Sequence, residues 1–114
     1  MPTTNLTMNI RKVTDGMRVI DVVGEITAFS EQQITDAHEE AGDGATAVIL
    51  NFEGLEYMNS GGIGLLVTTL IRAQRAGHAL RAYGLSDHYR EIFSLTRLDE
   101  AIAIYDDETA AIAG

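Results

Sequence analysis

The sequence predicts a single α/β domain built on a mixed sheet of about five strands, with helices mainly on one face. Segments typical of strands alternate with helical patterns, and the first two strands are joined by a turn too short for a crossover, so they should be antiparallel. Each later strand follows a helix, which favours parallel pairing through right-handed crossovers. The 114 residues have room for one core, so residues 1–114 are predicted as one domain with its core in residues 6–113.

A hairpin is expected at the amino-terminal end of the chain. Residues 6–13 alternate apolar and polar side chains, which is typical of a half-buried strand. Asp15 and Gly16 then predict a tight turn, and residues 17–23 a second strand that ends at Gly24.

The first helix should follow this hairpin. Ser30, with Gln33 three residues later, has the spacing of a capping box, and Gly42 and Gly44 are expected to end the helix. Its buried face is predicted from the helical spacing of Ile34, Ala37, His38 and Ala41.

The middle of the chain predicts a central strand and a second helix. Residues 47–52 are continuously apolar, as expected of a strand that is covered on both faces. After a loop that contains Ser60, apolar residues recur at helical spacing until Gly77, which should end the helix. The predicted apolar face consists of Ile63, Leu66, Val67, Leu70 and Ile71.

Two strands and two helices complete the prediction. Residues 79–83 and 101–105 are expected to be strands, separated by a helix that Ser86 caps. That helix should bury Tyr89, Ile92 and Phe93. Residues 107–113 predict a terminal helix, because acidic residues are favourable at a helix amino terminus.

The composition excludes several classes of partner and location. Eight basic residues against 17 acidic ones give a net charge of -9, which disfavours nucleic acid and anionic membranes as partners. The acidity fits a solubilising surface and, equally, a surface that attracts a basic protein. Cysteine is absent, and neither a leader peptide nor an apolar span is recognisable, so we expect a cytoplasmic protein without membrane insertion.

Ser60 is the candidate functional residue, because it stands between the central strand and the second helix. A serine at a helix amino terminus lies among unpaired N–H groups, where a phosphate is readily accommodated. Gly61 and Gly62 would let the backbone approach an anion or a partner, and Gly64 would allow close packing of the helix on the sheet. The alternative is that Asn59 and Ser60 only cap the helix, which is worth about 1 kcal/mol. Local spacing alone favours this cap.

Motifs for catalysis are not recognisable in the sequence. The residue two before Ser60 is Met58 and not glycine, so a nucleophile elbow is not matched, and the glycines lack the lysine of a nucleotide-binding loop. His38, His78 and His88 fall on different predicted elements without metal-ligand spacing. We therefore expect neither an enzyme nor a bound cofactor or metal.

Three landmarks in order resemble the STAS family, the anti-sigma factor antagonists, over residues 6–113. The second strand ends on Gly24-Glu25-Ile26, and the central strand leads into the loop Ser60-Gly61-Gly62-Ile63-Gly64. A leucine followed by acids, Leu98-Asp99-Glu100, precedes the last strand. The resemblance implies a STAS-like domain.

This resemblance implies a partner-switching antagonist. Such a protein would bind an anti-sigma factor that is also an ATP-dependent serine kinase and thereby free a sigma factor. The kinase would phosphorylate the serine that aligns with Ser60, and this would release the antagonist. A serine phosphatase would then remove the phosphate and restore the binding form. The docking edge would consist of Glu25, Thr27, Asn59, Ser60, Gly61, Gly62 and Ile63.

The chain departs from the family pattern at three positions where an aspartate is frequent. These positions hold Thr27, Asn51 and Asn59. The lost carboxylates motivate an alternative, a scaffold module of a signalling complex or a lipid-transport system in which Ser60 is not phosphorylated. Weak nucleotide binding is a third, less favoured hypothesis, and the edge strand over residues 6–13 is a candidate contact for a homodimer.

Overall fold

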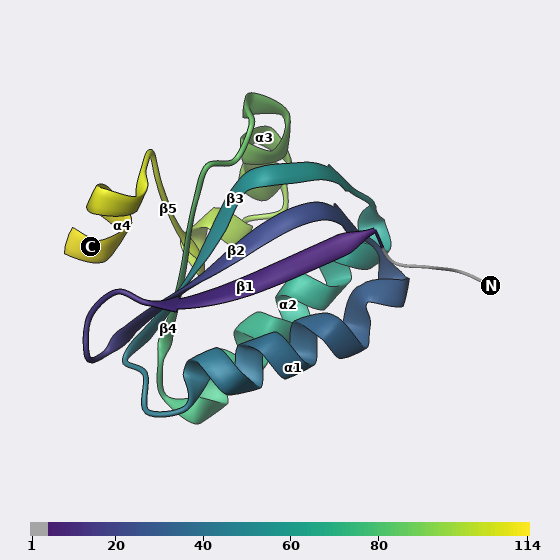
Figure 1. Ribbon diagram of the computed structural model, residues 1–114. Helices are drawn as coiled ribbons and strands as arrows, with labels where there is room; N and C mark the ends of the chain where they lie inside the picture. Colours follow the sequence, from purple (N-terminus) through teal and green to yellow (C-terminus); the bar gives the residue numbers. More distant parts are fainter. Residues whose placement is uncertain (1–4) are drawn as a thin grey trace.

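A computed structural model describes residues 5–114 of the chain (Figure 1). No helix within this described part is long and apolar enough to cross a bilayer. The elements in chain order are β1 (Leu6–Lys12), β2 (Met17–Ile26), the 3₁₀ turn η1 (Ala28–Ser30), α1 (Glu31–Gly42), β3 (Ala47–Met58), α2 (Ser60–Ala76), β4 (Ala79–Tyr83), α3 (Asp87–Leu95), the 3₁₀ turn η2 (Leu98–Glu100), β5 (Ala103–Tyr105) and α4 (Glu108–Ala113).

The five strands form one sheet in the order β1-β2-β3-β4-β5. The pair β1 and β2 is antiparallel and the other neighbours are parallel, because only the first connection is a hairpin. Helices α1 and α2 lie side by side under one face of the sheet, and α4 lies apart from them next to β5 (Figure 1). The predicted fold class is confirmed.

The core has two unequal parts, one on each face of the sheet. The larger cluster joins α1, α2 and α3 to the sheet and includes Phe93, Ile20 and Leu66, which are almost completely buried. The smaller cluster lies beneath α4 and contains Val19, Ile49, Tyr83 and Ala111. Because Val48 and Ile49 fall in different clusters, β3 is covered on both faces, as its continuous apolar run predicts.

Two strands are longer than predicted, and one is shorter. The strand β2 continues past Gly24 to Ile26, because Gly24 adopts a φ of 112° at an irregularity in the pairing instead of ending the strand. The strand β3 continues from Phe52 to Met58, since its second half pairs with this extension. The strand β5 begins only at Ala103, after the turn η2.

The prediction that Ser30 and Gln33 form the capping box of α1 was wrong. The Ser30 side chain does not cap α1, and it accepts instead a hydrogen bond of 3.1 Å from the Thr27 backbone N–H. The Thr27 hydroxyl in turn accepts from the Phe29 N–H at 3.2 Å. The reciprocal cap therefore spans Thr27 to Ser30 and stabilises η1, one turn earlier than predicted.

The buried face of α2 is also rotated from the predicted one. Leu66 and Leu70 are buried as expected, but Val67 and Ile71 are 39% and 44% exposed. Gly62, Thr69 and Ala73 fill the inner face instead. The two exposed residues thus leave apolar surface on the outside of the helix.

Two histidines that are 40 positions apart in the sequence meet inside the protein. His38 on α1 and His78, which precedes β4, are both buried, and their Nε2 atoms are 2.8 Å apart. The two histidines do lie on different segments, as predicted, but their contact was not foreseen. One ring must donate its proton and the other must accept it, so at least the accepting ring is neutral in this arrangement. Burial lowers the pKa of both, and the charge of Arg72 lowers that of His38 further.

We expect the histidine pair to make stability depend on pH. A folded-state pKa below the ordinary value of 6.5 means that the unfolded chain binds protons first, so stability is full above pH 6.5 and falls as the pH decreases. Between pH 7.5 and 5.5 the unfolding free energy should fall by at most about 1.4 kcal/mol for each of the two histidines, since one pH unit below 6.5 is worth about 1.4 kcal/mol per proton. Urea denaturation at the two pH values measures this, with His38→Leu/His78→Leu as the control. An equal loss of unfolding free energy in the control would contradict the assignment of this pH dependence to the histidine pair.

Candidate functional site

Ser60 is the first residue of α2, directly after the long strand β3. The residue before it, Asn59, is extended, and its Oδ1 accepts a hydrogen bond of 3.0 Å from the Gly62 N–H. Asn59 is therefore the helix cap, and Ser60 does not cap α2. Ser60 is exposed, and its hydroxyl has no hydrogen-bond partner among residues 5–114. The side chain is thus available to a modifying enzyme.

The amino terminus of α2 retains unpaired donors beside this serine. The Ile63 N–H bonds to the Asn59 carbonyl at 3.0 Å, and the Gly62 N–H is taken by the Asn59 side chain. The N–H groups of Ser60 and Gly61 have no acceptor within the helix. These two donors and the positive end of the helix dipole can stabilise negative charge on the Ser60 side chain.

The end of β2 and the turn η1 lie against this helix terminus. The Asn59 N–H bonds to the Ile26 carbonyl at 3.3 Å, and Glu25 pairs in register with Tyr57. A side chain added at Gly61 would lie 3.0 Å from the Cβ of Ala28 in η1. The structure therefore brings together the two segments of the predicted docking edge, residues 25–27 and 59–63.

Two glycines of the loop, Gly62 and Gly64, have different roles from those predicted. A Cβ at Gly62 would lie 2.4 Å from the Ile26 carbonyl oxygen, so Gly62 is the residue that permits close packing of α2 on the sheet. At Gly64, by contrast, a Cβ would meet nothing within 4 Å. The close-packing role predicted for Gly64 was therefore wrong.

Two exposed aromatic residues extend this surface and were missed in the sequence. Phe29, in the middle of η1, is 67% exposed, and Tyr57, the register partner of Glu25, is 48% exposed. The segment around Phe29 has no periodicity from which its exposure could be read. Large apolar side chains that remain exposed beside polar ones mark surfaces where proteins bind one another. We call residues Glu25, Thr27, Phe29, Tyr57 and 59–63 the serine surface.

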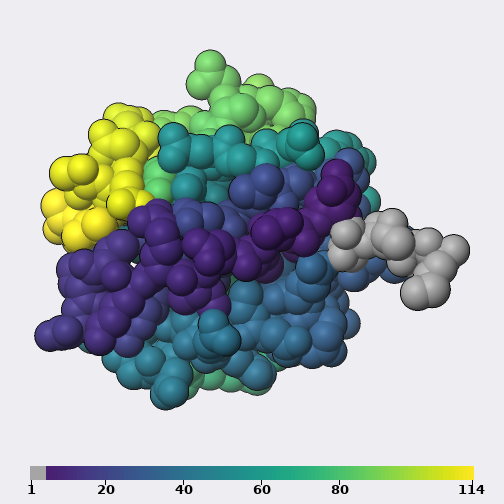
Figure 2. Space-filling model, viewed as in Figure 1, coloured from purple at the N-terminus to yellow at the C-terminus, as the bar shows by residue number. Residues whose placement is uncertain are grey.

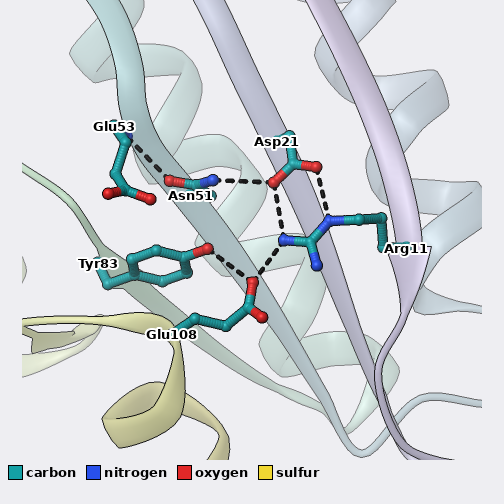
Figure 3. A network of polar contacts seen from close by, with 6 residues as sticks. All are labelled: Arg11, Asp21, Asn51, Glu53, Tyr83 and Glu108. Carbon is teal, nitrogen blue, oxygen red and sulfur yellow. Dashed lines mark hydrogen bonds and ion pairs between the residues drawn. The ribbon is translucent and has the colours of Figure 1, made fainter.

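Asn51 does not belong to the serine surface. It lies in the middle of β3, since the strand continues for seven further residues, and it joins a polar network beneath α4 (Figure 3). Its amide donates to Asp21 at 2.9 Å, and Asp21 also accepts from Arg11 at 2.7 Å. Arg11 further pairs with Glu108 of α4. An aspartate at position 51 could not donate this bond, so the asparagine is explained by its contact with Asp21.

The network holds its acids in the charged form. The hydrogen bonds from Arg11 lower the pKa of Asp21 and of Glu108, and the hydroxyl of Tyr83 contributes a further bond of 2.8 Å to Glu108. Burial, followed by the bond to Glu108, raises the pKa of Tyr83. The network thus fastens α4 to the hairpin of β1 and β2 and is separate from Ser60.

The described part of the chain offers no site with three or more His, Cys, Asp or Glu side chains arranged to hold a metal ion. The serine surface instead offers the unbonded Ser60 hydroxyl, the backbone donors of the helix terminus and the exposed side chains of Phe29 and Tyr57. These groups suit recognition by another protein.

A five-stranded mixed sheet with an exposed serine as the first residue of its second helix defines a small single-sheet α/β domain. The STAS domain model matches residues 10–111, and the chain belongs to this family. The anti-sigma-B factor antagonist of Staphylococcus aureus (strain NCTC 8325 / PS 47) is 28% identical over 104 residues, which cover 87% of this chain and 94% of that protein.

Two solved structures are similar as well. The phosphorylated form of the Bacillus cell fate determinant SpoIIAA superimposes with a TM-score of 0.72 at 25% identity, covering 94% of this chain and 97% of that one. An anti-sigma factor antagonist from Mycobacterium paratuberculosis gives a TM-score of 0.75 at 23% identity, covering 96% and 92% of the two chains.

Proposed function

We propose that this protein is an anti-sigma factor antagonist that acts by partner switching. In the unphosphorylated state it binds an anti-sigma factor through the serine surface, and phosphorylation of Ser60 releases it. The observation that carries the proposal is the exposed, unbonded hydroxyl of Ser60 at a helix terminus that packs against η1, the turn that carries the exposed Phe29. The names of the relatives in Staphylococcus and Mycobacterium support the same function.

Phosphorylation at this position would act on binding more than on folding. The helix terminus favours negative charge, so a phosphoryl group of about -1.5 to -2 charge is tolerated in the free protein. In a complex the same group would be buried among aromatic and glycine surfaces without a matching cation. The phosphate therefore stabilises the free state relative to the bound state.

The switch requires two enzymes besides the sigma factor. The partner that Ser60 binds would be a serine kinase that uses ATP, and a serine phosphatase would restore the hydroxyl. Within the serine surface, Asn59 positions Ser60, while Glu25, Thr27 and Ile63 contact the partner. Gly61 lets the partner approach the backbone, whereas Gly62 is buried against β2 and only holds the helix in place. The protein itself carries out no reaction in this cycle.

Intact-mass and phosphopeptide analysis of the protein from its own cells, in growth and under stress, tests the proposal. We expect a phosphate on Ser60 whose occupancy changes with condition, because a switch must be set and reset. Thr68, a second exposed hydroxyl on α2 whose Oγ1 is bonded to the Gly64 carbonyl at 3.1 Å, serves as the internal control and should stay unmodified. A Ser60 that is unmodified in every condition would contradict the proposal.

An unmodified Ser60 would favour the alternative of a constitutive scaffold module in a signalling or lipid-transport assembly. The observation behind this alternative is that Thr27 and Asn59, which lie in the serine surface, carry no carboxylate for a kinase to recognise. In a scaffold, these side chains serve only as caps for η1 and α2, as their hydrogen bonds allow.

A further inference from the structure

We infer that the outer edge of β1 is a second binding site, which takes an extended segment of a partner protein with basic residues at alternate positions. The strand β1 is at the edge of the sheet, and within residues 5–114 it pairs with β2 alone. Figure 2 shows it running along the surface, with α1 below it. This edge is distinct from the serine surface, so the inference does not depend on the proposed function.

The backbone of β1 presents hydrogen-bonding groups toward this edge. The Asn5 carbonyl accepts from Glu25 of β2, and the pairing of β1 with β2 has no irregularity. Since alternate residues of an antiparallel strand bond to opposite sides, Met8, Ile10 and Lys12 direct their N–H and C=O groups outward. An additional strand can pair with these groups, as peptides do in β-augmentation.

A groove of about 320 Å³ between β1 and α1 would receive the side chains of that strand. Met8, Ile10 and Ala37 form the apolar part of its lining, and Gln33, which also lines it, donates a bond of 3.1 Å to the Leu6 carbonyl. Two carboxylates, Asp36 and Glu40, line the groove from α1. The stem of a lysine or arginine could lie on the apolar side chains while its charged head reaches an acid.

The spacing of the two acids matches that of an extended chain. Asp36 and Glu40 are one helical turn apart, about 6 Å along α1. Alternate residues of a strand are about 6.7 Å apart and point to the same face. A segment with basic residues at positions i and i+2 would therefore place one beside each carboxylate.

A second copy of this chain fits the edge less well. Two copies joined through β1 would bring the acids of both α1 helices together, and each chain has a net charge of -9. Like charges in such proximity oppose association. A basic segment from another protein gives complementary charges instead.

The test uses two fluorescent peptides of identical composition at about 0.15 M salt, where long-range attraction is screened. The first peptide, fluoresceinyl-Thr-Val-Arg-Val-Arg-Val-Thr-amide, has its arginines on one face, and the second, fluoresceinyl-Thr-Val-Arg-Arg-Val-Val-Thr-amide, has them on opposite faces. We expect the first to bind at least about tenfold more tightly by fluorescence anisotropy, with NMR shifts at the amides of Met8, Ile10 and Lys12. Alternate N–H groups of a bound peptide face β1, and the others face solvent. N-methylation of the set that faces β1 should abolish binding because it blocks strand pairing, and N-methylation of the other set should not.

Variants of the protein locate the site. Asp36→Asn/Glu40→Gln should weaken binding of the first peptide at least about tenfold. Glu39→Gln/Asp43→Asn makes the same change in charge on α1 and at the residue that follows it, and should leave binding unchanged. Ser60→Asp should bind this peptide as the wild type does, which separates the two sites. Equal binding of the two peptides would overturn the inference. A dimer in analytical ultracentrifugation that the peptide does not dissociate would also overturn it and assign the edge to a second copy.

Discussion

Ser60→Asp is expected to abolish binding to the anti-sigma factor, with a loss of at least about 100-fold in affinity, or about 2.7 kcal/mol. The substitution places a permanent charge on the first residue of α2, where the complex would bury it. Ser60→Ala removes the hydroxyl without adding charge, so it should bind within about threefold of the wild type. Isothermal titration calorimetry with the purified partner measures both variants. Equal binding by the two would contradict the switch.

The loss in Ser60→Asp should not arise from unfolding. A carboxylate at a helix amino terminus is favourable by a few tenths of a kcal/mol, so the melting temperature should stay the same or rise slightly. Ser94→Asp adds the same charge at an exposed position on α3 and should leave the affinity unchanged. A similar loss of binding in this control would mean that net charge, and not the position of Ser60, determines the affinity.

Gly62→Ala is expected to destabilise the protein more than any other alanine substitution in the loop. The new Cβ would lie 2.4 Å from the Ile26 carbonyl oxygen and 2.8 Å from the Met58 side chain, so α2 would have to move away from β2. Overpacking of this kind costs about 1 to 3 kcal/mol, with the upper end expected because the nearest atom is backbone. Urea denaturation gives the change in unfolding free energy.

Gly64→Ala provides the matched control two residues further along the same helix. Its Cβ would meet nothing within 4 Å, and alanine favours helix by about 0.5 to 1 kcal/mol over glycine. This variant should therefore be stabilised while Gly62→Ala is destabilised. If both variants were destabilised, close packing at Gly62 would not be the reason for the loss of stability in Gly62→Ala.

The general position of the serine surface could be predicted from the sequence because it depends on local rules. Neighbouring parallel strands end at the same edge of a sheet, so the residues after β2 and β3 had to lie close together. Asn59 and Gly62 have capping spacing within four residues. These features require only contacts between residues near in sequence or fixed by strand order.

The features that could not be predicted depend on contacts between distant residues. The pairing of His38 with His78, and the bond of Asn51 to Asp21, are visible only once α1, α2 and the sheet are packed. The buried face of α2 was predicted with Val67 and Ile71 inside, because the apolar pattern of this helix is broad enough to allow either rotation. Close contact of Gly62 with the Ile26 carbonyl decides between these rotations.

The ion pair between Arg11 and Glu108 joins positions 97 residues apart and has a consequence for biosynthesis. The cluster of Val19, Ile49 and Tyr83 on one face of the sheet acquires its cover, Ala111, only when α4 docks. During synthesis, the residues of the larger core leave the ribosome before α4 does. This apolar patch therefore stays exposed until residue 111 has emerged. During that interval, this face of the sheet is where a chaperone, or a neighbouring nascent chain, would bind first.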